Sequence, residues 1–246
     1  MSERTTQVRL LLIWLLWCAC SAQSHDLITM ESAERYLAQA QQRLDVWHSR
    51  QAPGQRAEAA FQLGRMLDDI RDLLNRDLAA HGRVQGLPTE YLVRSLSAKG
   101  LTLEVSQSLG RFPANVSWYR ESLRVKPDSP HASEAMFGIM QGEFYDSFDA
   151  DPLQPRAQTW SELQNQIALG ERLVKRAPAH PEIEETQFIL AVLYTRAAHM
   201  APDRKAIAQY ADRARSSIAQ FQSRYPESLR ATALPILLQS LDQVRK

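Results

Sequence analysis

The sequence predicts an all-α fold of antiparallel helical hairpins, and three observations support this class. Glycine is scarce, with nine in 246 residues, whereas the helix-favouring residues alanine, leucine, glutamine, arginine and glutamate are plentiful. Apolar residues recur at alternating spacings of three and four, as they do on one face of a helix. Pro178 lies 51 residues after Pro127, and Pro226 lies 48 residues after Pro178. Such a period indicates stacked helical pairs.

Residues 1–22 have the layout of a bacterial secretory signal. Two arginines precede an apolar run over 10–17, which is too short to span a bilayer, and small residues follow it. An ordinary signal peptidase would cut after Ala22. The four residues that end at Cys20 resemble a bacterial lipoprotein box, in which the cut precedes Cys20 and the cysteine is acylated. We therefore expect an exported protein, and anchoring to the outer membrane if Cys20 carries lipid.

An N-terminal helical hairpin region is expected over 27–112. Two long helices are expected over 29–50 and 55–80, because apolar residues repeat at helical spacing in both, and a threonine can cap the first. They would form an antiparallel pair. A helix is also expected over 89–110, although the run 101–105 alternates as a strand would.

Helical repeats with a C-terminal capping helix are expected over 113–246. The expected helices are 116–126, 130–148, 156–177, 181–200 and 228–244, with a further helix between the last two that ends at Tyr225. Gly170 lies in an apolar seam, where a neighbouring helix can approach closely. Pro235 is expected to kink the last helix, because proline lacks the backbone N–H that a helix interior needs.

The proline junctions also carry capping signals. Ser129, His180 and Ser228 are the expected N-caps of the helices that follow each junction. Pro130 and Pro181 would then be first helical residues, where a missing N–H costs nothing. These features predict joints between stacked hairpins.

The C-terminal half resembles tetratricopeptide-repeat (TPR) proteins. The second-helix half of that repeat has a small residue, apolar residues and a closing proline at the spacing found at Ala214, Ile218, Phe221 and Pro226, and Ala191 and Tyr194 fit its first helix. The phrase over 221–231 is similar to one that ends repeats in BamD-like outer-membrane assembly lipoproteins. The resemblance covers about 116–244 and implies a TPR-like right-handed solenoid.

In such solenoids the first helices of successive hairpins line a groove that holds a partner segment. The resemblance therefore implies a partner groove formed by residues of 130–148 and 181–200. The candidate groove residues are Glu143, Phe144, Tyr145, Gln187, Tyr194 and Arg196. Phe144 and Tyr194 have an alternative interpretation as inter-helix core, because aromatic residues at helical spacing usually pack inward.

Motifs for catalysis, cofactor binding and metal binding are not present. The chain has a net charge of +1 and no basic block, which argues against nucleic-acid binding. Both cysteines lie in the leader, and no His-Glu-x-x-His, Gly-x-Ser-x-Gly or phosphate-binding loop occurs. A charged cluster in the second helix is expected to be its solvated face; it comprises Asp68, Asp69, Arg71, Asp72, Arg76 and Asp77.

Three functional hypotheses follow. The first is a non-enzymatic exported TPR-like scaffold that binds other cell-envelope proteins through a helical-repeat groove. The second is a periplasmic small-molecule or glycan-binding helical protein, with Trp47, Trp118 and Trp160 as stacking platforms between the N-terminal hairpin and the repeats. Convergence of these tryptophans on one pocket would favour it. The third is an all-helical enzyme, for which Glu104 is the one candidate acid.

Overall fold

The computed structural model describes residues 28–49, 51–81, 86–106, 109–147 and 158–244, and its regular structure is helical, which confirms the predicted all-α class. The described part of the chain contains nine α-helices and one 3-10 helix, η1. Their bounds are α2 Met30–His48, α3 Pro53–His81, α4 Leu87–Ala98, α5 Ser117–Val125, α6 Ala132–Asp146, α7 Trp160–Arg176, α8 Ile183–Met200, α9 Arg204–Arg224, η1 Leu229–Ala233 and α10 Leu234–Val244. No helix in these ranges is long and apolar enough to cross a membrane. The predicted leader with Cys20 lies outside the described residues.

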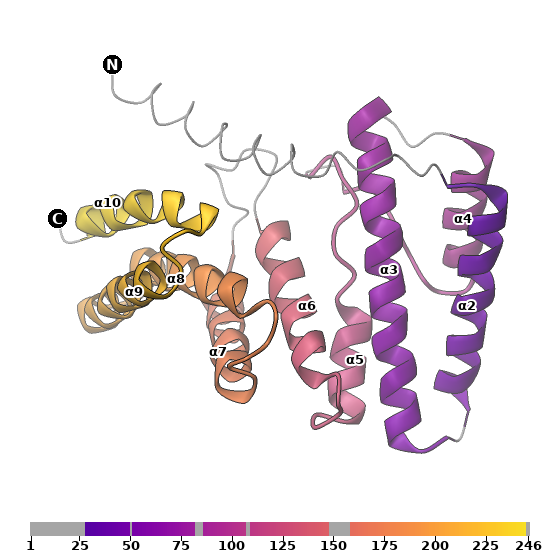
Figure 1. The fold of residues 1–246 in the computed structure, drawn as a ribbon, viewed down its shortest axis with the longest axis horizontal. Helices are drawn as coiled ribbons and strands as arrows, with labels where there is room; N and C mark the ends of the chain where they lie inside the picture. Colours follow the sequence, from indigo (N-terminus) through magenta and orange to yellow (C-terminus); the bar gives the residue numbers. More distant parts are fainter. Residues whose placement is uncertain (1–27, 50, 82–85, 107–108, 148–157, 245–246) are drawn as a thin grey trace.

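The helices follow one another along the longest dimension of the molecule, from α2 and α4 at one end to α9 and α10 at the other (Figure 1). The most extensive packing joins α8 with α9 and α3 with α5, and the latter contact spans the expected boundary near residue 112. One core cluster lies among α2, α3 and α4, and others lie among α6, α7 and α8 and among α8, α9 and α10. Each helix therefore buries its apolar seam against its neighbours in the stack.

Side-chain caps explain where several helices begin. The Thr29 hydroxyl accepts the N–H of Ser32 at 3.1 Å, and the Ser32 hydroxyl accepts the N–H of Thr29 at 2.9 Å. Thr159 and Glu162 form the same reciprocal arrangement at the start of α7. The Asp203 carboxylate accepts a backbone N–H in the first turn of α9. Each cap satisfies donors that have no partner inside the helix and contributes about 1 kcal/mol.

Three proline joints share one backbone geometry. In α5, α7 and α9 a single C-cap residue separates the helix from a proline. These residues, Lys126, Ala177 and Tyr225, have φ/ψ values of −148/88°, −135/68° and −132/58°. Each donates its N–H to the carbonyl four residues earlier, and its own carbonyl accepts the N–H three residues later. A second such turn follows, and all nine N–O distances lie between 2.8 and 3.1 Å. The repeat in the sequence is therefore also a repeat in the backbone.

The helices after the first two joints begin later than predicted. Helices α6 and α8 start at Ala132 and Ile183, two residues beyond Pro130 and Pro181. His131 and Glu182 hold the N-cap positions, so the predictions of Ser129 and His180 as N-caps are wrong. His180 instead accepts the N–H of Glu182 at 3.1 Å within the second turn of its joint.

The third joint follows the prediction more closely. The Ser228 hydroxyl accepts the N–H of Arg230 at 3.2 Å, which confirms it as a cap, here of η1. The predicted last helix is divided, because α10 begins at Leu234 after the 3-10 turn. Pro235 therefore lies in the first turn of α10, where no N–H is needed.

The predicted helix over 89–110 is also wrong at its C-terminal end. Helix α4 stops at Ala98, and Gly100 follows with φ of +78°, a conformation that glycine adopts without strain. The N–H of Leu101 donates to the carbonyl of Leu96 at 3.0 Å, which closes a Schellman-type helix end. Residues 101–105 have no regular secondary structure, and Leu101 and Leu103 are buried whereas Thr102 and Glu104 are exposed, as the alternating pattern there suggested.

Close approach at Gly170 is confirmed. A Cβ atom at this position would lie 2.8 Å from Leu190 Cδ2 and 3.0 Å from Met140 Sδ. Helix α7 can therefore approach α6 and α8 only because this residue has no side chain.

Candidate functional site

The six candidate groove residues do not form one open surface. Phe144 is 2% exposed and belongs to the core cluster among α6, α7 and α8, as its alternative interpretation expected. The Tyr145 hydroxyl donates to the Glu185 carboxylate at 2.8 Å, and burial together with this carboxylate raises the pKa of Tyr145. Gln187 lies half-buried on α8. Glu143, Phe144 and Tyr145 are consecutive in α6, so their side chains point in different directions around the helix.

The other groove candidates connect adjacent helices. Glu143 forms an ion pair with Arg120 of α5. The Tyr194 hydroxyl donates to Glu171 of α7 at 2.8 Å, and burial is the main cause that raises the pKa of Tyr194. These contacts connect α5 with α6 and α7 with α8.

Arg196 is a buried cation of the helix stack. Its guanidinium lies over the Phe144 ring, 5.5 Å from the centroid, and donates to the Ser147 hydroxyl at 2.8 Å. Burial lowers the pKa of Arg196 to about 10. The side chain therefore faces the end of α6.

A buried polar cluster, which the sequence did not predict, centres on Glu185. The Glu185 side chain is 6% exposed, and its carboxylate accepts from Tyr145 at 2.8 Å, from Gln141 at 3.2 Å and from Arg230 at 3.1 Å. Arg230 also lies 3.5 Å from Glu184. In the sequence Glu185 resembles an ordinary acidic residue in the first turn of a helix, and Arg230 is 45 residues away, so no local signal joins them.

The charged cluster of α3 is only partly solvated. Asp72 is 61% exposed, whereas the Asp68 and Arg71 side chains are 24% and 18% exposed and form an ion pair of 2.7 Å. Tyr119 of α5 donates to the other Asp68 oxygen at 2.6 Å. The prediction of a solvated face is therefore wrong for this pair, because α5 covers it.

Burial at Asp68 predicts a pH dependence of stability. Burial raises the pKa of Asp68, although Arg71 and Tyr119 oppose it. Because the folded pKa lies above the unfolded one, the native state binds the proton more tightly and becomes more stable as pH falls through the folded pKa. We expect wild type to gain stability relative to Asp68→Asn between pH 7 and about 4, by about 1.4 kcal/mol per unit of pKa difference. Urea unfolding of both proteins checks this, and a constant difference across this range would contradict it.

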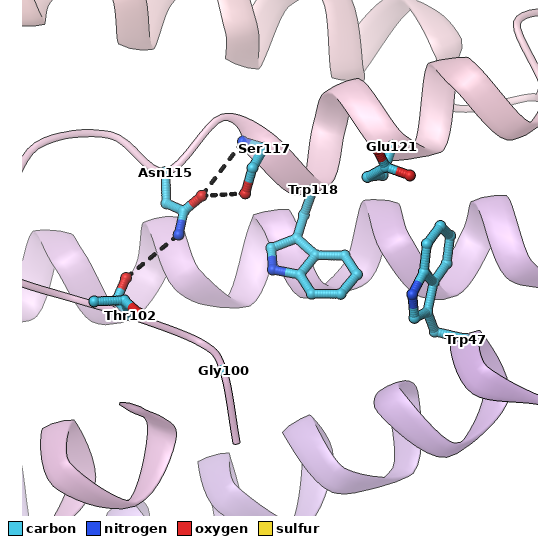
Figure 2. Close-up of a pocket in the computed structure, with 7 residues that line it drawn as sticks. All are labelled: Trp47, Gly100, Thr102, Asn115, Ser117, Trp118 and Glu121. Atoms are coloured by element: carbon cyan, nitrogen blue, oxygen red, sulfur yellow. Dashed lines mark hydrogen bonds between the residues drawn. The ribbon is translucent and has the colours of Figure 1, made fainter. Parts of the chain in front are cut away.

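A hollow of about 450 Å³ opens between α2, α5 and the segment after α4 (Figure 2). Its lining residues are Trp47, Gly100, Thr102, Asn115, Ser117, Trp118 and Glu121. The rings of Trp47 and Trp118 meet edge to face, with centroids 5.5 Å apart and planes at 84°. In Figure 2, Trp118 lies between Trp47 and the group of Asn115, Ser117 and Thr102.

Hydrogen bonds orient the polar side of this hollow. The Asn115 amide donates to the Thr102 carbonyl at 3.3 Å, and its oxygen accepts the hydroxyl and the N–H of Ser117. The Glu121 carboxylate pairs with Arg124 at 2.6 Å. The hollow thus combines two indoles with fixed neutral polar groups.

The third tryptophan lies elsewhere. Trp160 of α7 meets Tyr210 of α9 edge to face, with centroids 5.5 Å apart. Two of the three predicted stacking platforms therefore converge on one pocket, and one does not.

No group of three or more His, Cys, Asp or Glu side chains within the described ranges could hold a metal ion. Glu104 is exposed in the segment after α4 and lines a hollow of about 530 Å³ beside α4, together with Glu90 and Arg94. No family model matches this chain, and no curated protein or solved structure matches it either.

Proposed function

We propose that this protein is a non-enzymatic exported scaffold, a TPR-like right-handed solenoid that binds other cell-envelope proteins. The observation that carries this proposal is the common geometry of the three proline joints, at Lys126, Ala177 and Tyr225. Similar joints at nearly regular intervals favour helical pairs that stack in a repeating way, and stacked pairs present an extended surface for a partner. Acylated Cys20 would hold this surface at the outer membrane.

The partner surface is expected on the helices that follow the joints, because these are the first helices of each pair. In α6 and α8, residues such as Glu134 and Gln187 remain open or half-open to solvent. A partner segment would lie across these helices and use their polar groups. Neither cofactor nor metal is part of this mechanism.

A photo-crosslinking experiment in intact cells tests the scaffold function. We expect a photo-reactive residue at Glu134 or Gln187 to capture a discrete envelope protein. The same residue at Gln164 of α7 or Ala219 of α9, both exposed, is the matched control and should capture much less. Crosslinks of equal strength at all four positions, or at none, would contradict the proposed surface. The intact mass of the purified protein shows whether Cys20 carries lipid.

The second function, binding of a small molecule or glycan, is favoured by a specific observation. Trp47 and Trp118 converge on one hollow beside three neutral polar residues. Pockets that combine aromatic walls with a few oriented polar groups are typical of small-ligand sites.

A further inference from the structure

We propose that the hollow between Trp47 and Trp118 binds a neutral pyranose ring, either as a free sugar or as a unit of an envelope glycan. This proposal rests on the second function and is independent of the scaffold. It commits to a ligand with an apolar face, a rim of hydroxyl groups and no charge.

The aromatic wall matches the apolar face of a sugar. The C–H groups of a pyranose lie on its two faces and contact an aromatic ring, whereas its hydroxyls lie around the edge. Arg56 lies over the Trp47 ring at 5.0 Å from the centroid, and Trp118 packs on that indole at 84°. These contacts hold the two indoles in fixed positions. Neither indole N–H has an acceptor among the described residues, so both remain available to hydroxyl oxygens.

The polar side of the hollow matches the hydroxyl edge. Asn115 uses one N–H for the Thr102 carbonyl, which leaves its second N–H for a ligand. Ser117 donates its hydroxyl proton to Asn115 and keeps its oxygen lone pairs as acceptors. Because these groups are oriented before a ligand arrives, binding does not have to order them.

The charge of the lining selects a neutral ligand. The lining contains one carboxylate, Glu121, and no lysine, arginine or histidine. Arg124 compensates that carboxylate at 2.6 Å. No lining residue is cationic, although Arg56 lies over Trp47 beside the hollow, and a cationic ligand would compete with Arg124 for Glu121. The volume of about 450 Å³ lies within the range of small-molecule pockets, roughly 300 to 1,000 Å³.

Saturation-transfer NMR with glucose, N-acetylglucosamine and chitobiose tests the proposal on the exported chain. We expect transfer to the ring C–H protons of at least one sugar, with a dissociation constant on the order of 1 mM, as for ligands of about a dozen heavy atoms. Asn115→Ala should weaken binding about fivefold to tenfold, as expected for lost hydrogen bonds. Trp118→Ala should abolish it. Trp160→Phe, outside the hollow, is the matched control and should bind as wild type does.

The outcomes are distinct. Tighter binding of chitobiose than of the monosaccharides supports a glycan chain as the source, and equal binding supports a free sugar. No transfer to any of the three sugars overturns the proposal, as does transfer that Asn115→Ala and Trp118→Ala both leave unchanged. Circular dichroism confirms that each variant is folded, and the half-buried Asn115 keeps the test decisive if Trp118→Ala unfolds. Neither result alters the crosslinking test of the scaffold.

Discussion

Replacing Tyr119 with alanine is expected to lower the free energy of unfolding by about 3–5 kcal/mol, the usual cost of removing a buried aromatic side chain. The Tyr119 side chain is 3% exposed and lies between α3 and α6. A Cβ atom on Gly64 would lie 2.8 Å from one ring carbon, and one on Gly138 would lie 2.7 Å from another. Two glycines therefore make room for this ring.

Two further variants distinguish the contribution of the Tyr119 hydroxyl from that of the packed ring. Tyr119→Phe keeps the ring and removes the hydroxyl bonded to Asp68, so we expect a loss of about 1–2 kcal/mol. Gly138→Ala should also destabilise, although alanine favours a helix by about 1 kcal/mol, because its Cβ would press on the ring. Urea unfolding followed by circular dichroism measures all three. A Tyr119→Ala protein within about 1 kcal/mol of wild type would show that the helices close the gap.

Replacing Arg230 with alanine is expected to cost about 2–4 kcal/mol, since it leaves the buried carboxylate of Glu185 without its cation. The Glu185 side chain is 6% exposed and the Arg230 side chain 30% exposed, so solvent screens the pair only in part. The bond connects α8 with the start of η1. Its loss should therefore loosen η1 and α10 first, and amide hydrogen exchange would detect this.

A double variant supplies the control. In Arg230→Ala with Glu185→Gln, no buried charge remains and the amide still accepts from Tyr145. We expect the double variant to recover much of the stability, since the penalty arises mainly from an uncompensated charge. If the effects of the two substitutions on the free energy of unfolding are additive, Arg230 and Glu185 are not coupled, and an uncompensated buried charge does not explain the loss.

Much of the architecture could be predicted from local pattern. The seam through Ala211, Ala214, Ile218 and Phe221 is buried along α9, and Thr29 caps α2 as the sequence indicates. The close approach at Gly170 is also present. These features depend on residues within a few positions of one another, whose spacing is visible in the sequence.

The errors have a common physical origin. Ser129 and His180 fit an N-cap pattern, but a second turn stabilised by backbone hydrogen bonds occupies their positions. Helix α4 ends at Ala98, before Gly100, and Leu101 and Leu103 then pack into the core outside regular secondary structure. In each case backbone bonding or core packing outweighed a local propensity.

The candidate sites depended almost wholly on contacts between distant residues. The sequence named Trp47 and Trp118 as platforms but not Asn115, Ser117 or Glu121 beside them. It also gave no sign that the Glu185 carboxylate would be buried. Such neighbours depend on which helices pack side by side, and the sequence does not show this packing directly.

By itself the sequence determined the helical class, most helix positions and the regular proline joints, because apolar spacing and proline act on the chain locally. The tertiary structure alone decided which charges are buried, where α4 stops and which tryptophans share a hollow. The physical reason is that burial and desolvation depend on partners that lie far apart in sequence. Trp47 and Trp118 are separated by 71 residues, yet their ring centroids lie 5.5 Å apart.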